Sequence, residues 1–345
     1  MKKGKIDFSG LLSPKEWKIV TIFFAVILLA FLSAYLIPAS SPNQKDIRFV
    51  IQNGETLGSI TKRLHSAGII RSETLFKFFA YASGNARSLQ AGRYTLGNSN
   101  SYYSLISRFG SGEGDKLLKV ELYGGISNTG IFNRLKGLNL LTDDSLLLLT
   151  EDRNFLRSLE FEQKNLLGYL LPGGVSVFAN SSSREVLEAL HNNFNSFIND
   201  SLRKAVSASG YSLHQIITLA SIVDAETNRR EEMKTVAGVY LNRLKSGMKL
   251  QADPTVQFLL PEGWRRLTYR DLQIDSPYNT YKNYGIPPGP INNPGKDAIL
   301  SVIYPEKHKY LFFVSDSTGK HNFSTNFNDH SRLAKKFHIW LNSRN

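Results

Sequence analysis

The sequence predicts an α+β protein with a single N-terminal transmembrane helix, a small α+β module and a larger mixed α+β domain. Residues 19–37 form an uncharged apolar run near the N-terminus. Residues 47–96 alternate short strand patterns with helical ones, and residues after 116 combine amphipathic helical patterns with loops rich in proline and glycine. The chain has 345 residues, 41% apolar and 21% charged, which is enough for two hydrophobic cores.

The apolar run is long enough to cross a membrane. As a helix, Ile19 to Ile37 spans roughly 28 Å, close to the thickness of a hydrocarbon core. Five lysines and only two acidic residues precede it. Because positive charge stays on the cytoplasmic side, we expect residues 1–18 to form a cytoplasmic tail and the chain after the span to lie outside. The run is longer than the apolar part of a signal peptide and lacks a small-residue cleavage site, so we expect a retained anchor.

A small α+β module, residues 47–115, is predicted after a polar linker at residues 38–46. Its expected elements are a strand (47–51), a helix (56–66), a helix capped by Ser72 and broken at Gly84, a strand (91–96) and a helix (102–109) ending at Gly110. The Gly-Glu-Thr-Leu sequence after the first strand resembles the start of a LysM-type glycan-binding module. A packing module without a ligand is the alternative.

Residues 116–345 predict a mixed α+β domain. Residues 126–167 have helical character, and we interpret the leucine-rich stretch 138–149 as core. The other expected elements are a strand (116–122), one amphipathic helix (183–206), a helix starting at Ser212, a helix (233–244) stopped by Gly247, a helix after Asn293-Pro294, strands (310–315 and 322–324) and a C-terminal helix from about 328. Asp253-Pro254 resembles an N-cap followed by proline, and Thr268 with Asp271 resembles a capping box.

Composition restricts the partners. The chain has no cysteine, which excludes disulfides and thiolate zinc sites, and its seven histidines lack paired ligand spacing. We therefore expect neither a metal nor a cofactor. The net charge of +13 favours an anionic partner. Because the basic residues are spread along the chain, an anionic cell-envelope polymer fits better than nucleic acid, and we expect no nucleic-acid partner.

Two carboxylates end the helix that starts at Ser212. Gln215 completes a capping box at its start, and apolar side chains form a broad face. At 100° per residue, Glu226 and Asp224 fall at opposite edges of that face, about 160° apart. A carboxylate beside apolar surface loses solvation, so its pKa rises toward the value that a general acid needs. Periodicity does not choose between the two acids, and solvated charges at a helix end are the alternative.

Loops rich in polar and aromatic residues follow this helix. Residues 276–281 offer amide, hydroxyl and ring groups, the mixture that binds sugar rings, and Pro287-Pro288-Gly289-Pro290 would form a rigid wall. Capping is the simpler role for Asp253 and Asp271.

Six blocks resemble the YceG-like endolytic murein transglycosylases in order and spacing: LASIVDAET, VAGVYLNRL, GMKLQADPTV, DSPYNTY, YGIPPGPINNPG and YLFFV. The resemblance implies a membrane-anchored enzyme of the bacterial inner membrane, with its catalytic domain in the periplasm. Such enzymes cleave the β-1,4 bond between N-acetylmuramic acid and N-acetylglucosamine of nascent peptidoglycan strands, leave a 1,6-anhydro end and limit strand length. Peptidoglycan synthases are the implied protein partners.

The same resemblance assigns the residue before the threonine, Glu226, as catalytic and Asp224 as supporting. One carboxylate suffices when the sugar's own C6 hydroxyl attacks C1, because the same group can protonate the leaving oxygen and then accept the proton from O6. The substrate-binding residues that we expect are Asn242, Gln251, Asp253, Thr255, Tyr278, Asn279 and Tyr281.

The chain departs from the family pattern in two places. The family's Glu-Gly-Tyr-Leu-Phe-Pro-Asp-Thr-Tyr block is replaced by a different sequence at residues 167–175. A separate Glu-Gly pair, near the start of the family's catalytic region, is Gly124-Gly125 in this chain. We expect the first change to alter the far wall of the cleft. Two other functions stay open: a non-catalytic anchor that binds glycan and recruits synthases, and a glycoside hydrolase that uses Asp253, Asp271 or Asp275 as its second carboxylate.

Overall fold

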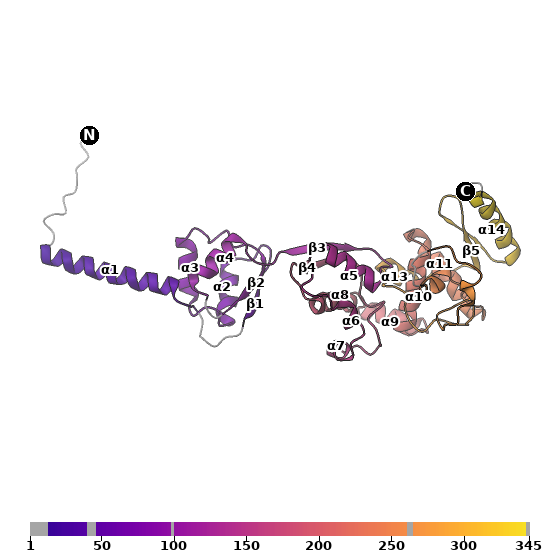
Figure 1. Cartoon of the computed structure of the whole chain (residues 1–345), viewed down its shortest axis with the longest axis horizontal. Helices are drawn as coiled ribbons and strands as arrows, with labels where there is room; N and C mark the ends of the chain where they lie inside the picture. Colours follow the sequence, from indigo (N-terminus) through magenta and orange to yellow (C-terminus); the bar gives the residue numbers. More distant parts are fainter. Residues whose placement is uncertain (1–12, 40–45, 98–99, 261–264, 343–345) are drawn as a thin grey trace, which may run out of the picture. The chain divides into compact units, whose positions relative to one another are not determined.

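The computed structural model describes residues 13–39, 46–97, 100–260 and 265–342, and the chain divides into two compact units, Met1–Leu117 and Leu118–Asn345 (Figure 1). Both units mix helices with two-stranded sheets, so the α+β prediction is confirmed. The first unit contains α1 (Pro14–Leu36), β1 (Ile47–Ile51), α2 (Leu57–Ser66), α3 (Glu73–Ala82), β2 (Gly92–Leu96) and α4 (Tyr102–Ser111).

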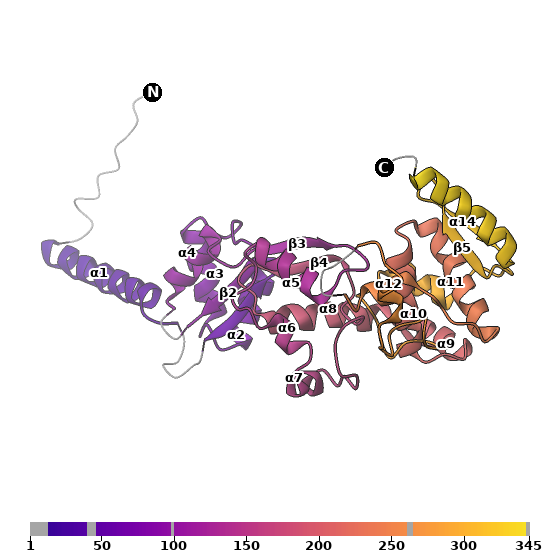
Figure 2. The ribbon, with the colours of Figure 1, turned by 45° about the vertical axis from the view of Figure 1, so that its right-hand side comes forward.

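Helix α1 is apolar from Ile19 onward and contains no buried residue, and its length and composition suit a membrane span. Ser13 and Glu16 form a capping box at its start. Helices α3 and α4 lie at its C-terminal end (Figure 2). Ala39, within the expected linker, is buried in the core of the first unit, and residues 40–45 of that linker lie outside the described residues.

The rest of the first unit is a two-stranded sheet covered by helices. Strands β1 and β2 are antiparallel, with Phe49 opposite Tyr94, and both side chains are buried. Ser72 caps α3 by accepting a hydrogen bond from the backbone N–H of Leu75, as predicted. Helix α4 continues past Gly110, because Gly112 is the residue that adopts the left-handed conformation (φ 72°) at its end.

The second unit begins with β3 (Leu117–Leu122), α5 (Asn128–Gly137), α6 (Leu146–Leu149), α7 (Arg153–Ser158), β4 (Gly173–Phe178), α8 (Ser183–Phe197) and α9 (Asp200–Ala208). Strands β3 and β4 pair, and β4 was not expected from the sequence. The helix predicted over 183–206 is two helices, because Asn199 caps a new one by accepting from the N–H of Leu202.

The region 126–167 is less helical than predicted. Asn139 and Glu160 have positive φ values of 52° and 54°, and such left-handed residues stop helices. The leucine-rich stretch is core only in part: Leu146 is fully buried, whereas Leu148 is 77% exposed.

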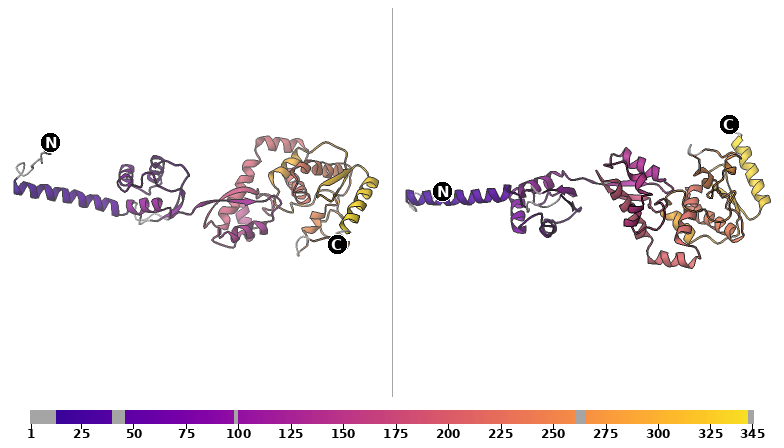
Figure 3. Two further views of the ribbon diagram at one scale, coloured as in Figure 1. Left: turned by 90° about the horizontal axis from the view of Figure 1, so that it is seen from above. Right: turned by 60° about the horizontal axis from the view of Figure 1, so that its bottom comes forward.

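The unit continues with α10 (Leu213–Glu226), α11 (Arg230–Lys245), α12 (Asp253–Gln257), a short 3-10 helix (Asp271–Gln273), α13 (Lys296–Ile303), β5 (Phe312–Ser315), β6 (His321–Ser324) and α14 (Phe327–Asn342). Helix α10 is central: residues 216–223 are all buried, and it packs against α11 and α13. Helix α14 packs on the antiparallel pair β5–β6 (Figure 3).

Candidate active site

Helix α10 delivers Glu226 to the surface of the core. Ser212 and Gln215 form the predicted capping box at its start, and the buried run 216–223 fixes the helix against its neighbours. The helix ends at Glu226, because Thr227 is extended (φ −147°, ψ 134°). The carboxylate therefore lies at the last turn of a rigid, buried helix rather than on a free loop.

The surroundings of Glu226 favour its protonated form. Burial raises the pKa of this carboxyl to about 7, and the negative charge of Asp253 acts in the same direction. Two groups oppose this shift in pKa: the Tyr240 hydroxyl, which donates a hydrogen bond to Oε1 of Glu226, and the positive charge of Arg243. Burial raises the pKa of Tyr240, so its hydroxyl remains a donor. Glu226 can thus hold or release a proton near neutral pH.

Glu226 lines a cavity of about 460 Å³. Three of the predicted binding residues, Gln251, Asp253 and Tyr281, line it. The Tyr281 hydroxyl donates a hydrogen bond to Oδ1 of Asp253, and burial raises the pKa of Tyr281. Gln251 has a positive φ of 48°, a conformation that non-glycine residues rarely adopt away from functional or tightly constrained sites. The other lining residues are Arg243, Phe312, Phe313, Val314, Ser315, His321, Phe327, His330 and Phe337.

Helix α11 and the C-terminal segment contribute cavity residues that were not predicted, among them Arg243 and His321. Arg243 is only 7% exposed, and it is held by the carbonyls of Leu311 (Nε–O 2.7 Å) and Leu250. His321 donates from its backbone N–H to Glu232, and its Nδ1 lies 2.7 Å from the same carboxylate. The sequence did contain one signal for Arg243: a charged residue three positions after Tyr240, on a helical face that is otherwise apolar, indicates a functional or paired side chain.

Three predicted binding residues hold the backbone of neighbouring segments through hydrogen bonds. Asn242 donates to the carbonyls of His308 (2.9 Å) and Tyr310 (3.0 Å). Thr255 is fully buried, and its hydroxyl bonds within the loop core. Asn279 is also fully buried. None of the three lines the cavity that contains Glu226.

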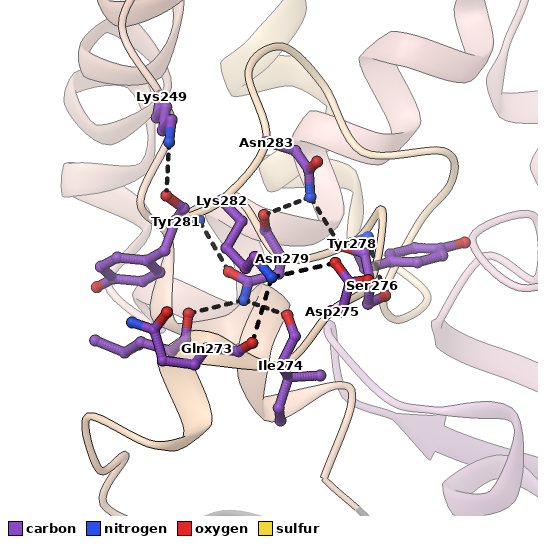
Figure 4. A network of polar contacts seen from close by, with 11 residues as sticks. Lys249, Gln273, Ile274, Asp275, Ser276, Tyr278, Asn279, Tyr281, Lys282 and Asn283 are labelled. Atoms are coloured by element: carbon purple, nitrogen blue, oxygen red, sulfur yellow. Dashed lines mark hydrogen bonds and ion pairs between the residues drawn. The ribbon is translucent and has the colours of Figure 1, made fainter.

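Asn279 holds its loop together (Figure 4). Its amide donates to the carbonyls of Leu272 (3.0 Å) and Ile274 (2.8 Å), and its Oδ1 accepts from the N–H of Tyr281 (3.0 Å). Tyr278 is half-buried against Phe258, with ring centroids 5.1 Å apart, and does not line the cavity. The loop thus positions Tyr281 toward the site and turns Tyr278 elsewhere.

The capping predictions for the two aspartates had different outcomes. Asp253 is the first residue of α12, not its N-cap, and makes no capping hydrogen bond; its carboxylate faces the cavity. Asp271 and Thr268 exchange the predicted reciprocal hydrogen bonds, and Arg265 adds an ion pair (2.8 Å). Those bonds hold the pKa of Asp271 below its usual range.

The family model that matches this chain is that of the YceG-like family, over residues 49–336. The chain belongs to the YceG-like family. It is 28% identical over 315 residues, 87% of each chain, to a Bacillus subtilis (strain 168) protein named endolytic murein transglycosylase. A Streptococcus pneumoniae (strain D39) protein of the same name is 27% identical over 86% of this chain, which spans 59% of that relative's length. The crystal structure of a YceG-like protein from Listeria monocytogenes matches with a TM-score of 0.58 at 28% identity, covering 84% of this chain and 99% of the other.

In this YceG-like chain, Asp224 faces away from the cavity. Its Oδ2 accepts a hydrogen bond from the N–H of Gly295 (2.6 Å), and burial raises its pKa. A Cβ on Gly124 would lie 2.7 Å from the same oxygen, so a side chain at that position would displace the carboxylate. Gly124 and Asp224 therefore fit each other.

The altered block 167–175 also lies away from the cavity that contains Glu226, and none of its residues lines that cavity. Its Gly168 donates to Oδ1 of Asn293 (2.8 Å), and its Tyr169 hydroxyl lies 2.7 Å from Nδ1 of His214, near the start of α10. The block thus contacts the start of α10 through Tyr169 and the loop that contains Asn293 through Gly168, and the expectation that it forms the wall opposite the catalytic glutamate stays a prediction.

Proposed function

We propose that this chain is an endolytic lytic transglycosylase of peptidoglycan. It cleaves the β-1,4 bond between N-acetylmuramic acid and N-acetylglucosamine within nascent strands and leaves a 1,6-anhydro end. The observation that carries the proposal is the position of Glu226, whose pKa is about 7, in a cavity of a YceG-like chain. The names of the relatives from Bacillus subtilis and Streptococcus pneumoniae support the same activity.

In this mechanism Glu226 acts twice. Its protonated carboxyl gives a proton to the departing glycosidic oxygen while the C6 hydroxyl of the muramyl residue attacks C1. The carboxylate then accepts the proton from O6, which regenerates the starting form. Tyr240 occupies Oε1 of Glu226, so Oε2 is the oxygen that meets the substrate. Attack from within one ring gains from proximity and requires no nucleophile from the protein.

A glycoside hydrolase is the second candidate, because Asp253 lines the same cavity as Glu226. In a hydrolase, Asp253 would activate water or attack C1 while Glu226 acts as the acid. The Tyr281 hydroxyl donates a hydrogen bond to Oδ1 of Asp253, so this oxygen is already engaged and is less available to activate water or attack C1.

The proposed enzyme is anchored by residues 19–37, with residues 1–18 in the cytoplasm. Residues 47–115 then form a LysM-like module and residues 116–345 the catalytic domain, both outside the inner membrane. Lysines before the span and the helix α1 support this topology. Such a location brings the site to newly made strands and to the synthases that make them.

Product analysis tests the activity. Purified peptidoglycan is digested by the full-length protein, by Glu226→Gln and by Asp224→Asn, and the fragments are identified by mass spectrometry. We expect 1,6-anhydro ends from the wild type and from Asp224→Asn, since asparagine can still accept the bond from Gly295. We expect none from Glu226→Gln, which should fold because glutamine has nearly the same shape and still offers an oxygen to the Tyr240 hydroxyl. Reducing ends would instead support the hydrolase, and absence of products from the wild type would support a non-catalytic anchor.

A further inference from the structure

Exposed aromatic side chains of the first unit gather where α1 meets α3 and α4. Phe78, Tyr81 and Tyr103 are 49%, 69% and 51% exposed. Phe78 lies against Phe31 of α1, with ring centroids 4.9 Å apart, and Tyr103 lies 5.4 Å from Tyr35. Tyr81 follows Phe78 by three residues and shares its side of α3. A cluster of large exposed aromatic residues marks an interaction surface.

No spacer separates this surface from the end of α1. Ile37 caps the helix, and Pro38 pairs with Ser101 as an isolated bridge. The N–H of Ala39 donates to the carbonyl of Asn100 (2.8 Å), and Ala39 is only 2% exposed. The chain is therefore bonded to the residues that precede α4 within two to three residues of the end of the helix.

The ring contacts fix the depth of the surface relative to the apolar span. Phe31 lies six residues before the end of the span at Ile37, which is about 9 Å along a helix. The ring of Phe78 is 4.9 Å from that of Phe31, and the ring of Phe79 is 5.2 Å from it. With α1 along the membrane normal, the ring of Phe78 therefore lies roughly 4 Å or more inside the level at which the apolar span ends.

We propose that Phe78, Tyr81 and Tyr103 insert into the boundary of the membrane that α1 crosses, and that lipid headgroups and upper acyl chains cover this aromatic face. The proposal rests on the membrane anchor proposed above. Phenylalanine suits the acyl region, while tyrosine places its ring in the boundary and its hydroxyl among the headgroups. The module then contacts the membrane in addition to α1, and this contact fixes the orientation of the module, with the β1–α2 turn pointing away from the lipid.

The absence of cysteine from the chain makes single-site labelling direct. The full-length protein is reconstituted in phosphatidylethanolamine–phosphatidylglycerol vesicles with one nitroxide, introduced through Phe78→Cys or Tyr81→Cys. Leu28→Cys, in the middle of α1, is the control for the span. Asn53→Cys is the matched control in the module, because it is exposed and follows the end of β1 farthest from Ala39. The relaxation of each label by oxygen, which concentrates in lipid, and by a water-soluble nickel chelate is then compared.

We expect labels at 78 and 81 to favour oxygen over the nickel chelate several-fold more than the label at 53, in the same direction as the label at 28. If 78 and 81 behave like 53 while 28 favours oxygen, the anchor stands and the membrane contact is wrong. If 28 also behaves like 53, the anchor fails and this proposal fails with it. Protection of 78 and 81 from both reagents, with spin–spin broadening, would indicate a second copy on this face and would overturn the lipid contact.

Discussion

Replacing Tyr240 by phenylalanine removes the hydroxyl that donates a hydrogen bond to Glu226 and leaves the ring in place. That bond stabilises the charged carboxylate, so its loss raises the pKa of Glu226 above about 7. Hydrogen bonds to charged groups contribute about 1.5–3 kcal/mol, and one pH unit corresponds to about 1.4 kcal/mol. The pKa of Glu226 should therefore rise by about one to two pH units.

The proton donor must be protonated, so activity of the wild type should fall as pH rises through about 7. In Tyr240→Phe this fall should move to higher pH, and the maximal rate should drop because Glu226 loses its orienting partner. The assay is the initial rate of anhydro-product release between about pH 5 and about pH 10. The upper limit of this pH range is chosen so that it includes the predicted rise in the pKa of Glu226. A fall that stays at the pH of the wild type, or moves lower, would refute the role assigned to Tyr240.

Two further substitutions test neighbouring features. Asp253→Asn keeps an acceptor for Tyr281 but removes a negative charge that raises the pKa of Glu226. The fall in activity should therefore move to lower pH, by less than the shift expected for Tyr240→Phe. A move to higher pH would contradict this electrostatic coupling. Asn279→Ala leaves two half-buried carbonyls and one N–H without their partner and should lower the free energy of unfolding by about 2–4 kcal/mol in chemical denaturation. If Asn279→Ala instead left stability unchanged and weakened glycan binding, the side chain would belong to the binding site after all.

The elements that local patterns encode were predicted well. The capping box at Ser212, the run of apolar residues after it and the carboxylate at Glu226 all lie within one helix, so spacing alone defines them. The strand pair that contains Phe49 and Tyr94 was predicted for the same reason. Errors arose where a single residue interrupts a pattern: Asn199 divides one predicted helix into two, and Asn139 ends another.

Roles within the loops could not be predicted in this way. Asn279 and Tyr281 are two residues apart and both polar, yet one is fully buried and the other lines the cavity with Asp253. The sequence shows the same amide, hydroxyl and ring groups whether a given side chain is buried in the loop or lines the cavity. Which of them meets a substrate depends on the backbone that each side chain contacts.

The sequence by itself determined the apolar span, the helix that ends in Glu226 and the two acids between which periodicity could not choose. The family resemblance then selected Glu226. Only the tertiary structure decided that Tyr240 and Asp253 act on the pKa of Glu226, while Asp224 accepts a bond from Gly295 on another side of the helix. The physical reason is distance: desolvation and charge act over a few ångströms in space, and packing, not sequence separation, sets those distances.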